Sequence, residues 1–141
     1  MEPKTHELTV CADVDQLHDV LAFVDDLLEE HDCPIKAQMQ IDVALEELFV
    51  NIAQYAYPDS TGKAVIRVSI SSEFAEITLI DSGIPYDPLK KPDPDVTLNA
   101  QDRPIGGLGI FMTKKLMDNV SYEYKDGRNI LTIKKCFQLS T

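Results

Sequence analysis

Apolar side chains recur at helical spacing through the first part of the chain, after a short alternating segment. Residues 7–12 alternate apolar and polar side chains, which is typical of a short strand. A helix is then expected from Asp13, a good N-cap residue, to about residue 31, and Pro34 suits the first turn of a second helix over 35–56. The spacing places these side chains toward the core: Leu17, Val20, Leu21, Val24, Leu27 and Leu28 on the first helix, and Ile41, Leu45, Leu48, Ile52 and Tyr55 on the second.

The pattern changes to that of strands in the middle and at the end of the chain. Residues 64–71 and 74–80 predict two strands with a tight connection, and 120–125 and 129–136 predict a closing hairpin turned at Asp126-Gly127. Strands and helices do not alternate throughout, which argues against a doubly wound parallel sheet. We therefore predict an α/β two-layer sandwich, in which helices cover one face of a mixed, mostly antiparallel sheet.

Between these regions lies a stretch with almost no apolar periodicity. The loop 85–105 contains five prolines, and a connection of this length in a compact domain is usually functional or mobile. A helix over 107–118 is expected to follow the loop. Its predicted core side consists of Leu108, Phe111, Met112 and Leu116.

Size and charge narrow the classes of function. With 141 residues, 44% hydrophobic and 26% charged, residues 1–141 are expected to form one domain. The net charge of −11 disfavours binding to nucleic acid or to an anionic membrane, and a basic protein partner fits better. We expect a cytoplasmic protein, because there is no apolar run of membrane-spanning length, no secretory leader and only three cysteines without metal-ligand spacing.

The second predicted helix carries a possible catalytic pair. Glu47 and Asn51 are four residues apart and so share one helix face, offset from the core side. A carboxylate can accept a proton from a hydroxyl group, and a carboxamide oxygen can bind a hard cation such as Mg²⁺. Taken alone, such a pair is most often part of a solvated face.

Two further segments could bind a nucleotide. Asp81 directly follows a predicted strand, and its carboxylate could accept a hydrogen bond from the adenine amine, with Gly83 allowing the backbone to approach the ring. In the segment Gly106-Gly107-Leu108-Gly109, which opens a helix, free N–H groups could bind phosphates. The segment matches neither a dinucleotide fingerprint nor a Walker loop, since no strand directly precedes it and no Lys-Ser/Thr follows.

Taken in order, Glu47-x-x-x-Asn51, Asp81-x-Gly83 and Gly107-x-Gly109 resemble the N, G1 and G2 boxes of the histidine-kinase-like (GHKL) ATPase superfamily. Within it, residues 7–136 resemble the stand-alone branch of anti-sigma factors and serine-protein kinases. Tyr55 departs from the His that this superfamily often has just before its Ala-Tyr pair. The resemblance implies an ATP- and Mg²⁺-dependent protein, a sigma factor and its antagonist as partners, and a homodimer.

The resemblance also implies a role for each matching residue. Asn51 would hold Mg²⁺, Glu47 would be the base, and Arg103 would meet the terminal phosphate. Asp81 would bind the adenine amine, supported through water by the Thr132 hydroxyl. The loop 85–105 would form a lid. The remaining implied contacts are backbone N–H groups given to the phosphates by Gly106, Gly107, Leu108 and Gly109.

Three functions remain open at this point. The first is a serine/threonine-protein kinase that acts as an anti-sigma factor and phosphorylates an antagonist protein. The second is a non-catalytic module whose affinity for a protein depends on bound nucleotide. The third is a catalytic domain of the histidine-kinase type that acts in trans.

Overall fold

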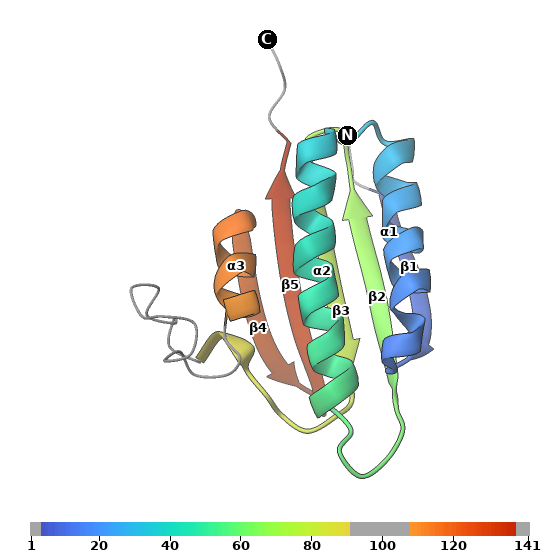
Figure 1. Cartoon of the computed structure of the whole chain (residues 1–141), viewed down its shortest axis with the longest axis vertical. Coiled ribbons are helices and arrows are strands. Elements are labelled where there is room, and N and C mark those ends of the chain that lie inside the picture. The colour runs from blue at the N-terminus through green and yellow to red at the C-terminus, as the bar shows by residue number, and fades with distance from the viewer. Residues whose placement is uncertain (1–3, 91–107, 138–141) are drawn as a thin grey trace.

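Five strands form one sheet in the computed structural model, which describes residues 4–90 and 108–137 (Figure 1). The strands are β1 (Lys4–Cys11), β2 (Lys63–Ile70), β3 (Phe74–Asp81), β4 (Asn119–Lys125) and β5 (Arg128–Cys136). Their spatial order is β1-β2-β3-β5-β4, and every neighbouring pair is antiparallel. The predicted α/β two-layer sandwich is confirmed, with a sheet that is antiparallel at every described pair and not mixed.

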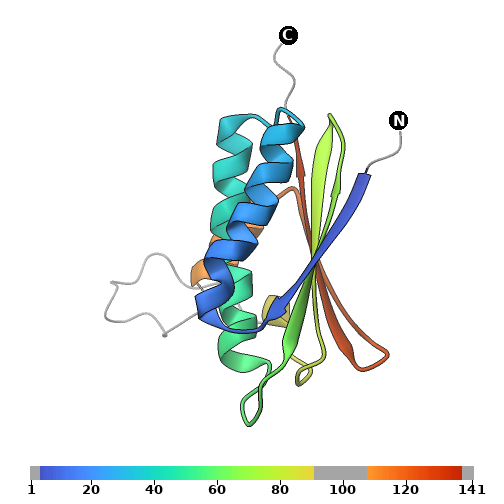
Figure 2. The same cartoon turned by 90° about the vertical axis from the view of Figure 1, so that its right-hand side faces the viewer.

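Three helices cover one face of this sheet, as the edge-on view shows (Figure 2). They are α1 (Leu17–Glu30), α2 (Ile35–Tyr55) and α3 (Leu108–Leu116), and α2 lies between the other two (Figure 1). Two short 3-10 turns, η1 (Val14–Gln16) and η2 (Pro88–Lys90), precede α1 and follow β3. Within the described residues, none of the helices has the length and apolar character needed to cross a membrane.

Local chemistry explains where these elements begin and turn. Asp13 accepts a hydrogen bond from the Asp15 N–H at 2.9 Å, so it caps η1 and not α1 directly. Asp126 and Gly127 turn the β4–β5 hairpin with φ angles of 54° and 76°. Two successive left-handed residues suit a two-residue turn that matches the twist of the strands, and Asp-Gly is a favoured pair for it.

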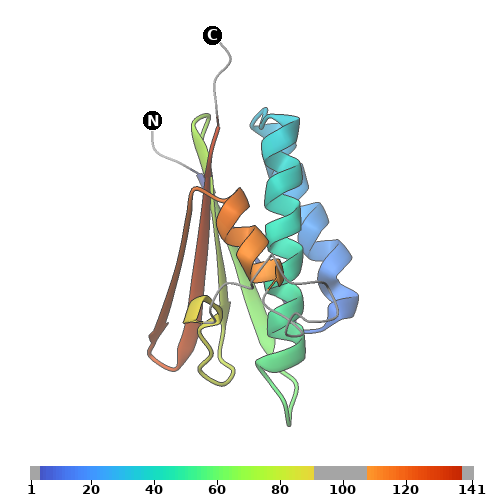
Figure 3. The same cartoon turned by 60° about the vertical axis from the view of Figure 1, so that its left-hand side comes forward.

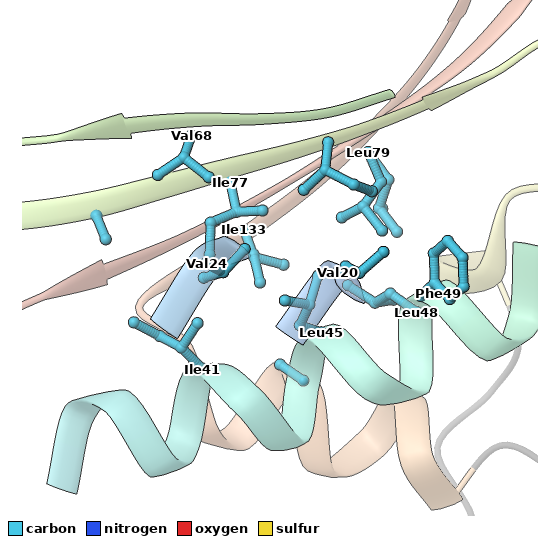
Figure 4. Packing of buried hydrophobic residues seen from close by; sticks show 14 of the residues in the cluster. Val20, Val24, Ile41, Leu45, Leu48, Phe49, Val68, Ile77, Leu79 and Ile133 are labelled. Carbon is cyan, nitrogen blue, oxygen red and sulfur yellow. The ribbon is translucent and has the colours of Figure 1, made fainter. Parts of the chain in front are cut away.

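The core lies between α1, α2 and the inner face of the sheet (Figure 4). α2 supplies Ile41, Leu45, Leu48 and Phe49, all of which are almost fully buried. They meet side chains from α1 and from the three central strands: Val20, Val24, Val68, Ile77, Leu79 and Ile133. Burial of large aliphatic side chains stabilises the fold by about 1.5–3 kcal/mol each, so this packing fixes the orientation of α2.

The structure corrects two expectations about side-chain orientation. Tyr55 is 52% exposed and does not belong to the core. On α3 the buried side chains are Ile110 and Thr113, followed by buried Met117 directly after the helix, whereas Met112 is 41% exposed. The apolar spacing missed this face because it includes a threonine, whose hydroxyl donates to the Gly109 carbonyl at 2.9 Å and can therefore be buried.

Candidate functional site

A cleft lies at the end of the sheet where β3 ends and β5 begins, next to the C-terminal half of α2. Its lining is mostly apolar and includes the polar side chains of Asn51, Asp81 and Asn129, which is the usual character of a small-molecule site. The lining residues are Leu48, Asn51, Ile52, Tyr55, Ala56, Asp81, Ile84, Tyr86, Pro88, Tyr122, Asn129 and Leu131.

Asp81 is the buried carboxylate of this cleft. Its Oδ1 accepts hydrogen bonds from Asn129 Nδ2 and from the Gly83 N–H, both at 2.9 Å. Burial raises the pKa of the Asp81 carboxyl above its ordinary value, and these two hydrogen bonds oppose part of that rise. Both donors bind Oδ1, so Oδ2 has no partner among the described residues and remains available to a ligand.

Asn129 is a site residue that the sequence analysis missed. Its Nδ2 donates to Asp81 Oδ1 and to the Ile84 carbonyl, each at 2.9 Å. Its Oδ1 accepts from the Tyr86 N–H at 3.2 Å and from the Tyr122 hydroxyl. A signal was present in the sequence, because alternation along β5 puts a buried polar residue on the same face as Leu131 and Ile133.

Thr132 does not lie beside Asp81, so its expected role in supporting that carboxylate is wrong. The register pairs Asp81 with Asn129 and Thr132 with Thr78. Thr132 is an odd number of residues from Asn129, so its side chain points to the opposite face of the sheet. There its hydroxyl lies 3.2 Å from the Thr78 hydroxyl.

Glu47 and Asn51 lie together on α2, as their spacing predicts. Asn51 Nδ2 lies 3.4 Å from Glu47 Oε1, and Asn51 also lines the cleft. The Glu47 carboxylate lies against the first turn of α3: a Cβ atom added at Gly109 would overlap it. α3 runs beside α2 in Figure 3, so the first and third sequence boxes meet through Glu47 and Gly109.

Gly83 has a structural reason to be a glycine. A Cβ atom at this position would overlap the backbone carbonyl of Ala56, and the adjacent Ile84 N–H donates to that same carbonyl at 2.9 Å. Tyr57 holds the same segment from the other side, since its hydroxyl accepts from the Ser82 N–H at 2.8 Å and donates to the Lys63 carbonyl at 2.7 Å. The loop after Asp81 is thus fixed to the end of α2.

The remaining predicted residues belong to the glycine segment and the loop before it. Arg103, Gly106, Gly107 and loop residues 91–105 lie outside the described residues, so their roles stay predictions. Leu108 is the first residue of α3. The described part of the expected lid ends with η2, where buried Pro88 lines the cleft.

The donor set also bears on the expected metal. The described residues contain no group of three or more His, Cys, Asp or Glu side chains that could hold a metal ion. Mg²⁺ commonly binds through one or two protein oxygens and the phosphates of a nucleotide. Asn51 fits that mode, because its Nδ2 points to Glu47 and its Oδ1 has no hydrogen bond to the described residues.

These features define an α/β sandwich with a ligand cleft formed by the second helix and the ends of two central strands. The chain belongs to the histidine kinase-like ATPase domain family, whose model matches residues 10–135. The family assignment agrees with the order of the three boxes in the sequence.

Named relatives point to one branch of that family. The chain is 28% identical over 96 residues to the serine-protein kinase RsbW of a strain of Bacillus cereus and to that of Bacillus thuringiensis subsp. konkukian. Each match covers 65% of this chain and 60% of the relative. The fold is similar to part of the solved structure of the RsbU and RsbW domains of Rv1364c from Mycobacterium tuberculosis. The TM-score is 0.68 and the identity is 16%, over 97% of this chain and 34% of the other.

Proposed function

We propose that residues 1–141 act as one Mg²⁺-dependent ATP-binding domain of a cytoplasmic serine/threonine-protein kinase. The observation that carries this proposal is the meeting of Glu47, Asn51 and Gly109 at the edge of the cleft that contains Asp81. A possible base, a possible cation ligand and the start of a helix are together beside a buried acceptor. The similarity to serine-protein kinases of the RsbW type supports a serine or threonine hydroxyl as the group that receives the phosphoryl group.

Adenine recognition would depend on the unshared oxygen of Asp81. Its Oδ1 already accepts from Asn129 and Gly83, which fixes the plane of the carboxylate. Its Oδ2 can then accept from an exocyclic amine, whereas guanine presents a carbonyl oxygen at that ring position. The mostly apolar lining of the cleft suits the faces of a purine ring.

Phosphoryl transfer would use residues at the other edge of the cleft. Asn51 would hold Mg²⁺, which neutralises phosphate charge when it is bound. The hydroxyl oxygen of the acceptor Ser or Thr attacks the γ-phosphorus, the bond to the ADP oxygen breaks, and Glu47 takes the hydroxyl proton. Arg103 would meet the terminal phosphate, and the N–H groups of Gly106, Gly107, Leu108 and Gly109 would bind the phosphates.

The proposed biological role is that of an anti-sigma factor. It would sequester a sigma factor and phosphorylate the antagonist protein that competes with it, as the RsbW-like branch implies. The strongly acidic chain suits a basic protein surface and opposes direct contact with nucleic acid. Homodimer formation, which the resemblance also implies, remains a prediction.

The test is transfer of labelled γ-phosphate from ATP to proteins of a lysate from the source organism. We expect labelled phosphoserine or phosphothreonine with the wild type, and at least a hundredfold slower labelling with Glu47→Gln. Glu46→Gln, which alters the exposed neighbouring carboxylate, is the matched control and should label at the wild-type rate.

Three results would contradict or redirect the proposal. Equal labelling by wild type and Glu47→Gln would remove Glu47 from catalysis. Mg²⁺-dependent ATP binding without any transfer would favour the non-catalytic module, and label on histidine would favour the histidine-kinase type. Unchanged ATP affinity of Asn51→Ala in the presence of Mg²⁺ would remove Asn51 as the cation ligand.

A further inference from the structure

A line of exposed apolar side chains runs along the first half of α2, on the side away from the sheet. Ile35 is 76% exposed, Met39 is 63% exposed and Val43 is 50% exposed. They follow one another at four-residue intervals, so they form one continuous stripe about 12 Å long. We call these three residues the α2 ridge.

The α2 ridge is separate from the nucleotide cleft. Met39 is twelve residues from Asn51, which corresponds to about 18 Å along a helix. None of the three ridge residues lines the cleft. Three large apolar side chains at regular spacing on solvent are unfavourable unless something covers them, and such patches commonly mark protein-binding sites.

The neighbouring helix gives this surface a strong charge. α1 contains five acidic residues and no Lys or Arg, and its Asp26, Glu29 and Glu30 are exposed. Glu29 and Asp25 lie against α2, because Gln38 Nε2 donates to both, at 3.4 Å and 3.2 Å. Glu46, on α2 itself, adds another exposed carboxylate after Val43. The α2 ridge is therefore bordered by carboxylates on its α1 side.

Another apolar side chain lies on the helix that flanks α2 on its other side. Gly109 of α3 lies against the Glu47 side chain of α2. Met112 lies about one turn later on α3, and 41% of its surface is exposed. Met112 and Met39 have flexible, polarisable side chains, which adapt to partners of different shape.

We propose that the α2 ridge binds an amphipathic helix of a partner protein, with apolar residues at i, i+4 and i+7 and with Lys or Arg along one flank. The apolar face would cover Ile35, Met39 and Val43, so that two helices pack with the side chains of each between those of the other. The basic flank would lie toward α1, where charge complementarity sets orientation and speeds association. This proposal does not depend on nucleotide binding.

The test uses a designed 18-residue helical peptide with a leucine stripe and a lysine flank, titrated into the full chain by fluorescence anisotropy. We expect saturable binding that weakens with added salt. Met39→Glu and Val43→Glu should each weaken it at least tenfold. The matched control is Val14→Glu, because Val14 is a 46% exposed apolar residue on η1 and should not affect binding. The same peptide with a glutamate flank should bind at least tenfold more weakly than the lysine peptide.

Each other outcome would overturn the proposal. Equal binding by wild type and both ridge variants, or no saturable binding at all, would show that the ridge is not a docking site for such a helix. Equal affinity for the lysine and glutamate peptides would show that the carboxylates beside the α2 ridge do not contribute to binding. Light scattering would reveal the remaining alternative: a concentration-dependent dimer that Met39→Glu abolishes would mean that a second copy covers the ridge. Circular dichroism of every variant should match the wild type, because all three positions are exposed.

Discussion

At the scale of single residues, Asn129 organises the cleft by forming all four hydrogen bonds that its carboxamide offers. Its Nδ2 donates two hydrogen bonds and its Oδ1 accepts two. These four bonds connect β5 with Asp81, with the loop after β3 and with Tyr122 on β4. A rotated amide would lose all four bonds, so the side chain has one stable orientation. The same orientation keeps one oxygen of Asp81 available to a ligand.

The first prediction is that Asn129→Ala weakens ATP binding at least tenfold. It should also lower the free energy of unfolding by about 1–3 kcal/mol, because it leaves buried partners unsatisfied. Calorimetry with Mg²⁺ and denaturant unfolding measure the two effects. Thr132→Val is the control and should bind ATP like the wild type, since Thr132 lies on the other face of the sheet. A stronger effect of Thr132→Val than of Asn129→Ala would refute this assignment.

The second prediction separates two glycines by what surrounds them. Gly109→Ala should slow phosphoryl transfer at least tenfold, because the new Cβ displaces the Glu47 carboxylate. Its stability should change by less than about 1 kcal/mol, since a side chain can move and Ala favours a helix. Gly83→Ala should instead lower stability by about 1–3 kcal/mol, because the Ala56 carbonyl is backbone and cannot yield as easily. Phosphoryl-transfer rates and urea unfolding of both variants measure these effects. The prediction is wrong if Gly109→Ala loses more stability than Gly83→Ala and transfers phosphate at the wild-type rate.

Two of the residues that line the cleft, Asn51 and Asp81, were predicted from the sequence, and the errors at other positions have physical causes. Glu47, Asn51 and Asp81 were predictable because each follows from spacing within one element or from the end of a strand. Thr132 was placed wrongly because its position depends on the register between β3 and β5, which are distant in sequence. Asn129 was missed for the same reason: its partners come from β3, β4 and the connecting loop.

At the scale of elements, the contact between α1 and α2 contains a cluster of like charges. Asp42 of α2 is partly buried and faces Asp25 and Glu29 of α1. Burial, hydrogen bonding to Asp25 and repulsion by both carboxylates raise the pKa of Asp42 to about 7. The two helices therefore pack best when Asp42 is neutral.

The third prediction is that stability falls as pH rises from about 4 to about 7. The folded pKa of Asp42 exceeds its ordinary value of 3.8, so the folded state binds more protons than the unfolded state in this window. The stabilising contribution is complete below the unfolded pKa and is lost as pH passes through the folded pKa. Asp42→Asn should remove this loss and raise stability at pH 8, with little change at pH 4. Because solvent screens the partly exposed carboxyl, the gain should be about 1 kcal/mol. Urea unfolding across pH 4–8 measures it, and parallel curves for the two proteins would exclude Asp42 as the source.

The helices and strands also show which parts of the fold the apolar periodicity of the sequence can predict. The bounds of α2, β2 and β3 were predictable because long apolar patterns decide them locally. The buried face of α3 was not, because the helix has nine residues and its buried side includes Thr113. Tyr55 fitted the helical spacing of α2, yet it follows the last core turn and instead lies near Tyr86, with ring centroids 6.4 Å apart.

At the scale of the whole molecule, ligand binding in the cleft should stabilise the entire sheet. The cleft joins α2 to β3, β4 and β5, so unfolding of any of them would release a ligand. Binding to the folded state alone stabilises a protein by about 2.7 kcal/mol when the ligand is present at a hundred times its Kd. Binding energy in the cleft is therefore measurable as global stability.

The fourth prediction is that ATP with Mg²⁺, at a hundredfold excess over its Kd, raises Tm by about 5–10 °C. GTP at the same concentration should give less than half of this shift, because the missed hydrogen bond to Asp81 costs about 1.5–3 kcal/mol. Differential scanning fluorimetry of the wild type with each nucleotide measures the difference. Equal shifts with ATP and GTP would show that Asp81 does not read the base.

The register of the sheet also determines where attachments can be made without disturbing the cleft. Lys4 pairs with Ile70 and Cys136 pairs with Phe74, so the start of β1 and the end of β5 lie at the same short edge of the sheet. Asp81 and Asn129 lie at the opposite edge, seven residues along β3 or about 24 Å away. In a Cys11→Ser variant, which removes the other exposed thiol, a fluorophore or surface tether joined through Cys136 would therefore face away from the nucleotide. Immobilised by that thiol, the protein would present its cleft to solution, a favourable geometry for measuring ligand exchange on a single surface.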